Sequence, residues 1–155
     1  MWKRALFILL SLLASLLLLM GCGANASTGG TSTPGTGGPV SLYVDASSYR
    51  PSDKIVVLLS NRGTKTITFE DHQTNCTVIQ VEHQVDGVWK MIDNCGVLSH
   101  TSTFALDAGK EMQVTLSAPT NGWPEGLYRV TLTYRLSRTT SPFITVHSGT
   151  FIVKS

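Results

Sequence analysis

Four histidines are the side chains of this 155-residue sequence best suited to bind a metal ion: His72, His83, His100 and His147. Met91 and Met112 could add soft sulfur ligands. The chain has no Cys-x-x-Cys, His-x-His or His-Glu-x-x-His motif, so none of the spacings is a known ligand pattern. On a strand, His72 and Cys76 would share a face about 13 Å apart, too far for one ion. We therefore expect solvent-facing or rim histidines and no cofactor, and keep a metal-binding envelope protein as an alternative.

Catalytic patterns are also absent from the sequence. There is no Gly-x-Ser-x-Gly elbow, and His147, Ser148 and Gly149 are too close in the chain to form a triad. The acidic residues show no paired-carboxylate spacing, and no Gly-rich phosphate loop opens a helix. The sequence therefore predicts a protein that is not an enzyme.

Cys22 ends a pattern with a specific chemical meaning. Lys3 and Arg4 precede the apolar run 5–20, and Leu19-Met20-Gly21-Cys22 closes it. The run has 16 residues, whereas a membrane-spanning helix needs about 20. A basic start and a small-residue end are typical of a cleaved export signal.

The segment resembles the lipobox of bacterial lipoproteins, in which the cysteine is diacylated and becomes the first residue after cleavage. Met20 departs from the pattern, which usually has a small residue there. The resemblance implies a signal peptide over residues 1–21 and acyl chains such as palmitate on Cys22. Each buried acyl methylene contributes about 0.8 kcal/mol to membrane binding. We therefore expect a protein lipid-anchored to the cell membrane, on its extracytoplasmic face.

Residues 22–38 form a linker of mostly Gly, Ser, Thr and Ala. Without large apolar side chains this linker cannot offset the entropy of ordering, and 16 such residues span roughly 20–25 Å. The chain has 12 basic and 10 acidic residues, and Lys3 and Arg4 account for the excess. No basic stripe is left in residues 39–155, so we expect no nucleic-acid partner.

Residues 39–155 have the pattern of one all-β domain. Alternating or β-branched stretches predict strands near 42–44, 55–59, 67–69, 78–81, 88–92, 112–116, 128–135, 143–146 and 150–153. Asp86-Gly87 predicts a two-residue hairpin turn. There is no sustained helical period after the apolar run. The expected fold is a β-sandwich of about seven to eight antiparallel strands.

Four segments resemble bacterial immunoglobulin-like domains: 49–63 their second strand, 87–89 their central hairpin, 106–109 the turn before their fifth strand and 126–130 their penultimate strand. The resemblance spans roughly residues 40–153. It implies that Tyr128 is a buried corner residue whose hydroxyl bonds back to the chain, with Val130 packed beside it. Val130 stands where antibody-type domains carry a core cysteine, so their inter-sheet disulfide cannot form here. Related sandwich families include extracytoplasmic protease inhibitors and plain spacer modules.

Cys76 and Cys95 remain once Cys22 is assigned to lipid, and they flank the predicted hairpin in an oxidising compartment. With a two-residue turn at Asp86-Gly87, residues whose numbers add up to 173 lie opposite one another in the hairpin. Cys95 then faces Val78, diagonal to Cys76 on the same face. We expect a disulfide that contributes on the order of 3 kcal/mol by closing this loop. A thiol pair that binds a soft metal is the alternative.

Two loops are candidates for binding. Trp123 could anchor a partner, since tryptophan is common in interface hot spots, or it could close one end of the sandwich. Trp89 is expected in the core. The polar segment 137–142 follows the longest strand and contains Arg138, Thr139 and Thr140.

The domain is therefore expected to bind a protein or envelope component, or to act as a spacer. A sandwich-type protease inhibitor is the alternative function. An ordered segment 137–142 beside 61–64 would favour it, because such inhibitors insert adjacent loops into a cleft.

Overall fold

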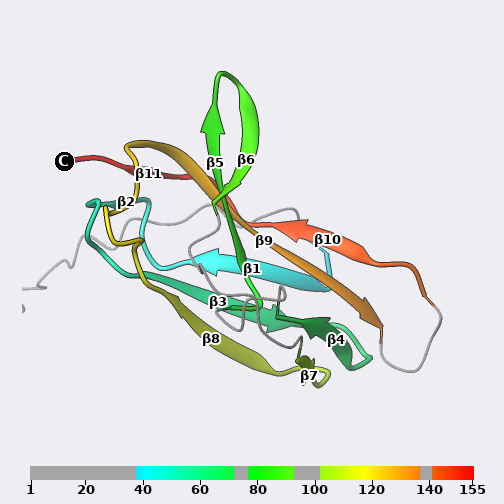
Figure 1. Cartoon of the computed structure of the whole chain (residues 1–155). Helices are drawn as coiled ribbons and strands as arrows, with labels where there is room; N and C mark the ends of the chain where they lie inside the picture. Colours follow the sequence, from blue (N-terminus) through cyan, green and yellow to red (C-terminus); the bar gives the residue numbers. More distant parts are fainter. Residues whose placement is uncertain (1–37, 72–76, 93–101, 137–140) are drawn as a thin grey trace, which may run out of the picture.

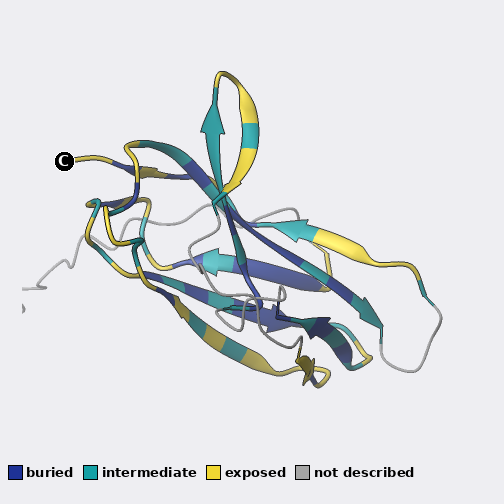
Figure 2. Ribbon diagram, in the orientation of Figure 1, coloured by how far each residue is buried: buried dark blue, intermediate teal, exposed yellow. Residues whose placement is uncertain are grey.

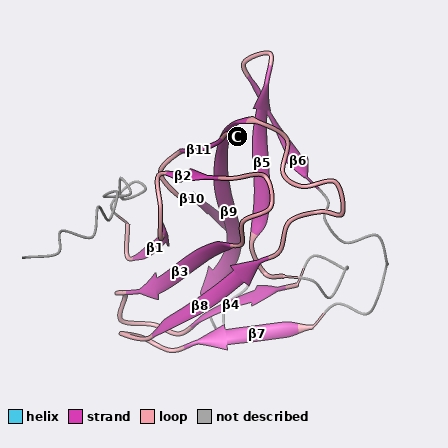
Figure 3. Ribbon diagram, turned by 90° about the vertical axis from the view of Figure 1, so that its left-hand side faces the viewer, coloured by secondary structure: helices cyan, strands magenta, loops and turns pink. Residues whose placement is uncertain are grey.

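Every regular element of the protein is a β-strand in the computed structural model, which describes residues 38–71, 77–92, 102–136 and 141–155 (Figures 1 and 3). The strands are β1 (Val40–Val44), β2 (Ser48–Tyr49), β3 (Ile55–Asn61), β4 (Ile67–Glu70), β5 (Gln80–Val85), β6 (Val88–Ile92), β7 (Thr103–Leu106), β8 (Glu111–Leu116), β9 (Gly126–Leu136), β10 (Ile144–His147) and β11 (Phe151–Val153). These ranges contain no helix that is long and apolar enough to span a bilayer.

The strands form two sheets around one core. The smaller sheet has the order β1-β3-β8, and the larger one has eight strands organised about β9. Side chains alternate along β1, β3 and β9, so that one face of each strand is apolar and buried (Figure 2). Leu42, Leu59 and Leu132 from these three strands are all inaccessible to solvent. This arrangement confirms the predicted all-β sandwich.

β9 positions most of the larger sheet because four strands pair with it. Tyr128 pairs with β5 and β11, Thr131 with β5 and β10, and Tyr134 with β4 and β10. Since each strand has two edges, β5 and β4 share one edge of β9 while β11 and β10 share the other. Both edges of this 11-residue strand are therefore largely occupied.

The structure differs from the predicted seven to eight antiparallel strands in two respects. It has eleven strands within the described ranges, because the short β2 and β7 lack a readable alternation. β2 also runs parallel to β11, with Tyr49 beside Val153. The chain reaches β2 by leaving the smaller sheet after Val44. Asp45 fixes this crossing, since its carboxylate accepts hydrogen bonds from the Tyr49 hydroxyl and, at 3.2 Å, from the Val56 amide.

The β5–β6 hairpin has the predicted two-residue turn. Asp86 and Gly87 have φ angles of 54° and 78°, the positive pair that a type I′ turn requires. Val85 pairs with Val88 and Val81 with Ile92, so the predicted register is correct. The hairpin extends beyond the rest of the molecule, and its β6 side is largely exposed (Figures 1 and 2).

Tyr128 is the corner residue that the sequence predicted. Its side chain is fully buried, and its hydroxyl donates a hydrogen bond to the carbonyl of Pro124, four residues earlier. The ring lies between His83, stacked at 4.6 Å, and Phe151, stacked at 5.6 Å between centroids. Val130 is also fully buried. Burial raises the pKa of Tyr128 to about 12.

Candidate functional site

Most of the site residues predicted from the sequence lie outside the described ranges. These are Cys22, Cys76, Cys95, Arg138, Thr139 and Thr140. The lipid anchor, the disulfide and the polar contact loop therefore stay predictions.

Trp123 is a core residue. Only 1% of it is exposed, and its indole nitrogen donates a 3.0 Å hydrogen bond to the carbonyl of Asp53. Its ring meets the edge of Tyr128 at 6.3 Å and 77°. Of the two interpretations offered for Trp123, the structure supports closure of one sandwich end. The alternative, in which Trp123 anchors a partner, has no support here, because the indole is buried.

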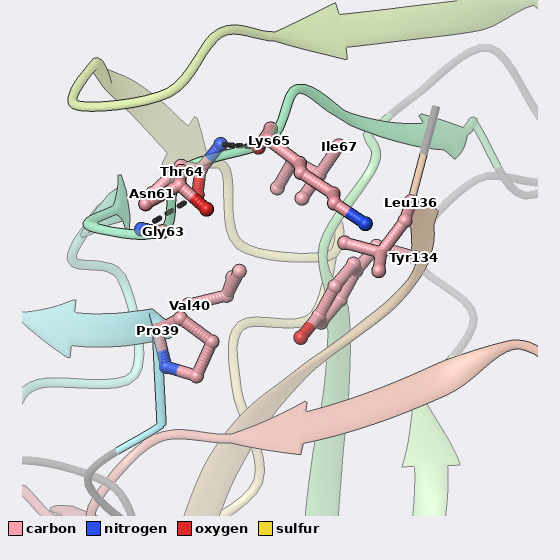
Figure 4. A pocket seen from close by; sticks show the side chains of 9 residues that line it. All are labelled: Pro39, Val40, Asn61, Gly63, Thr64, Lys65, Ile67, Tyr134 and Leu136. Atoms are coloured by element: carbon pink, nitrogen blue, oxygen red, sulfur yellow. Dashed lines mark hydrogen bonds between the residues drawn. The ribbon is translucent and has the colours of Figure 1, made fainter. Parts of the chain in front are cut away.

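A pocket of about 380 Å³ lies where β1 begins and β3 and β9 end (Figure 4). Asn61 shapes one wall: its side-chain amide donates to the carbonyls of Lys65 and Leu106, both at 3.0 Å, and accepts from the Gly63 amide. The full lining is Pro39, Val40, Asn61, Gly63, Thr64, Lys65, Ile67, Tyr134 and Leu136. Leu136, the last residue of β9, lines this pocket together with Gly63, Thr64 and Lys65 from the β3–β4 turn.

The chemistry of this pocket is mostly apolar. Val40, Ile67 and Tyr134 are buried, and burial raises the pKa of the Tyr134 phenol. Lys65 is an exposed cation on the same wall. Such a pocket could receive an apolar side chain of a partner.

The outward face of β9 carries a second, more organised group of side chains. Arg129, Thr131, Thr133 and Arg135 alternate with the apolar core residues of the strand. Thr131 is itself only 3% exposed. We call these four residues the outer row. They face Glu82, His147, Thr145 and Thr68, respectively, on the neighbouring strands.

A hydrogen-bond chain in the outer row fixes the orientation of His147. The Thr131 hydroxyl donates to Glu82 Oε2 at 2.9 Å and lies 2.9 Å from His147 Nδ1. Since a carboxylate has no proton to give, the single hydroxyl proton of Thr131 goes to Glu82. Thr131 must then accept from Nδ1–H. We therefore assign the proton to Nδ1, which leaves Nε2 of the neutral ring as an acceptor.

Burial and the nearby Arg129 guanidinium both lower the pKa of His147 below its ordinary value of 6.5, and Glu82 partly opposes them. The imidazole is therefore neutral at neutral pH, as the assigned tautomer requires. Within the described ranges, no group of three or more His, Cys, Asp or Glu side chains could hold a metal ion. Thr131 and Glu82 are the neighbours of the His147 ring on this face.

Each end of the outer row has an arginine held between a carboxylate and an aromatic ring. Arg129 Nε bonds to Glu82 at 2.5 Å, and its guanidinium carbon lies 4.4 Å from the Trp89 ring centroid. Trp89 is half-buried beside this arginine, so the expectation that it belongs to the core is wrong.

Arg135, at the other end of the outer row, has the same kind of partners but is more exposed to solvent. Arg135 Nη2 lies 3.1 Å from Glu70, and its guanidinium carbon lies 5.2 Å from the ring of Phe143, which is 60% exposed. Arginine–aromatic contacts of this kind contribute about 0.5–1 kcal/mol at exposed sites. Both guanidiniums are thus fixed by partners on two sides.

The alternation of β9 is evident in the sequence, but the outer row is not evident there as a site. The signal for the four residues was present, since polar side chains occupy every second position from Arg129 to Arg135. Their partners come from four other strands, and pairing across that distance cannot be read from one sequence.

Comparisons with known proteins place the fold. A family model described as "Bacterial Ig-like domain" matches residues 38–144. The search of curated proteins finds no match. Among solved structures, the chain is similar to Spo0M, a sporulation control protein from Bacillus subtilis, with 15% identity and a TM-score of 0.36. The alignment covers 75% of this chain and 49% of that protein, so the chain spans about half its length. A TM-score this low carries no argument about function.

Proposed function

Because the chain belongs to the bacterial Ig-like domain family, we propose that it is a membrane-anchored extracytoplasmic lipoprotein whose Ig-like domain is a non-catalytic binding module. An Ig-like domain fits a binding or spacer role. The Leu19–Cys22 motif behind a basic, apolar start supports the lipid anchor. The linker over 22–38 would hold the domain within a few nanometres of the membrane. A Cys76–Cys95 disulfide belongs to the same proposal.

The outer row is the observation that favours binding over spacing. A spacer needs only a solvated surface, in which exposed arginines lose entropy for little gain when they are fixed. Here Arg129 and Arg135 are each held by a carboxylate and a ring, and His147 is held in one tautomer. Groups held in place before a ligand arrives lose less entropy on binding it.

The anchor is tested by Cys22→Ser in the native host. We expect the variant to move from the membrane fraction to the soluble fraction, because it has no thiol to acylate. Ser27→Ala is the control, because it changes a nearby residue of the linker and leaves the Cys22 thiol in place. Intact mass spectrometry that finds an unmodified Cys22 in the membrane-bound wild type would contradict the proposal.

The binding role is tested by retention of the full chain on envelope material of the host after lipid extraction. Phe143→Ala removes an exposed ring from the end of the outer row, and Val88→Ala is the matched control. Val88 is also 60% exposed but lies on the side of the hairpin opposite Trp89. We expect Phe143→Ala to lower retention and Val88→Ala to leave it unchanged. Equal retention of all three proteins would favour a spacer.

A sandwich-type protease inhibitor is the second candidate. It is favoured by the pocket in which Leu136 lies beside the β3–β4 turn, because inhibitors of this type present adjacent loops. Thr64 is exposed in that turn. If the protein inhibits cysteine or serine endoproteases and Thr64→Arg abolishes the inhibition while Phe143→Ala does not, this second function holds.

A further inference from the structure

The spacing of the two aromatic rings indicates an elongated ligand. Trp89 contacts Arg129 and Phe143 contacts Arg135, at opposite ends of the outer row. Six residues of extended strand separate the two arginines, about 20 Å at roughly 3.3 Å per residue. Phe143 offers a flat apolar ring that is 60% exposed, and Trp89 is half-buried with Arg129 against its ring. A ligand that contacts both rings must run along β9.

The groups between the rings both donate and accept hydrogen bonds. Nε2 of His147 is an acceptor in the assigned tautomer. The Thr133 and Thr145 hydroxyls lie 3.2 Å apart, and either can donate to the other. Thr145 is exposed. The row therefore suits a ligand that carries many groups able to do both, as hydroxyl groups can.

The charge of the row is balanced. Arg129 is paired with Glu82 and Arg135 with Glu70, so these four side chains carry no net formal charge. A polyanion would require cations without carboxylate partners. The row therefore favours an uncharged ligand.

A peptide strand does not fit this place. Extended peptides add to a sheet through a free edge, where main-chain groups are unpaired. Tyr128, Thr131 and Tyr134 each have neighbours on both sides, so β9 offers its face rather than an edge. Linear polysaccharides combine apolar ring faces with many hydroxyl groups.

We propose that the outer row binds a linear, uncharged polysaccharide that lies along β9 from Trp89 to Phe143. This inference rests on the proposed binding function and names its ligand class. Several sugar units contact the row at once, with the rings stacked at the two ends and the hydroxyl groups bonded in the middle.

The test is titration calorimetry on the full-length protein in a detergent without a sugar headgroup. The probes are cellohexaose and chitohexaose, with cellobiose and chitobiose as short controls and polygalacturonate as the anionic control. We expect at least one hexasaccharide to bind at least tenfold tighter than its disaccharide, because only the longer chain reaches both ends. Trp89→Ala and Phe143→Ala should each weaken it at least tenfold, and Val88→Ala should not.

Three results would overturn the inference: no binding of either hexasaccharide, tighter binding of polygalacturonate, or full binding by both ring variants. Failure here is distinguishable from failure of the binding role. If Phe143→Ala still lowers envelope retention while no hexasaccharide binds, the module binds through the row but its ligand is not an uncharged glycan. If retention is also unaffected, the binding role itself is wrong.

Discussion

The two sides of β9 show how one strand can serve two purposes. Its inward side chains are Tyr128, Val130, Leu132 and Tyr134, none more than 3% exposed. They are held by close packing against apolar neighbours from both sheets. The outer row occupies the alternate positions of the same strand and is held by hydrogen bonds and ion pairs to charged and polar partners. Inward residues should therefore govern stability, and outward residues should govern binding.

Leu132→Ala is expected to have the largest effect on stability. The side chain is fully buried, and removal of its methyl groups leaves a cavity that costs about 3 kcal/mol. Urea unfolding should show a lower midpoint, while the protein that remains folded binds as the wild type does. A loss below about 1 kcal/mol would mean that the core around β9 repacks.

Gly126→Ala tests the backbone at the start of β9. Gly126 has a φ of 147°, and an added Cβ would lie 2.3 Å from Nε2 of His83, whose ring is stacked on Tyr128. We expect a cost of about 2 kcal/mol in urea unfolding. Gly87→Ala is the control, since its φ of 78° is strained but its Cβ would meet nothing. An equal cost for both would show that the contact with His83 is irrelevant.

Tyr128→Phe removes the corner hydroxyl and should cost about 1 kcal/mol. Its pH dependence is diagnostic. The pKa of Tyr128 is raised from 10.0 to about 12 in the folded protein. Its stabilising effect is therefore complete below pH 10 and is lost as the pH rises toward 12. Urea midpoints should fall less steeply in this range for the variant. Identical curves would mean that the hydroxyl is solvated.

His147→Asn is expected to have the smallest effect and to act through pH. Glu82 from β5 and Arg129 and Thr131 from β9 face the imidazole, whose pKa is lowered in the folded state. Its contribution is therefore complete above pH 6.5 and falls as the pH drops through the lowered pKa. Below pH 6.5, the variant should lose less stability than the wild type in urea unfolding. A steeper loss in the variant would contradict the proton assignment.

The inward side of β9 could be predicted from the sequence because it depends on local alternation. The hairpin turn at Asp86-Gly87 and the corner at Tyr128 were predictable for the same reason, since each is set by neighbours in the chain. The outer row could not be predicted as a site, since it depends on which strands flank β9. Trp89 shows the limit most clearly. The alternation of its own strand does not say what its ring contacts, and only the pairing of β5 with β9 brings Arg129 against that ring.

The most direct test of this account is a substitution scan along β9 from Tyr128 to Arg135, with two measurements on each variant. Urea midpoints report stability, and retention on lipid-extracted envelope material reports binding. The account predicts that even-numbered positions lower the midpoint, that Arg129, Thr133 and Arg135 lower retention, and that the buried Thr131 affects both. If both effects fall together at positions other than Thr131, or if no substitution at Arg129, Thr133 or Arg135 changes retention, the division of the strand into a structural and a binding side is wrong.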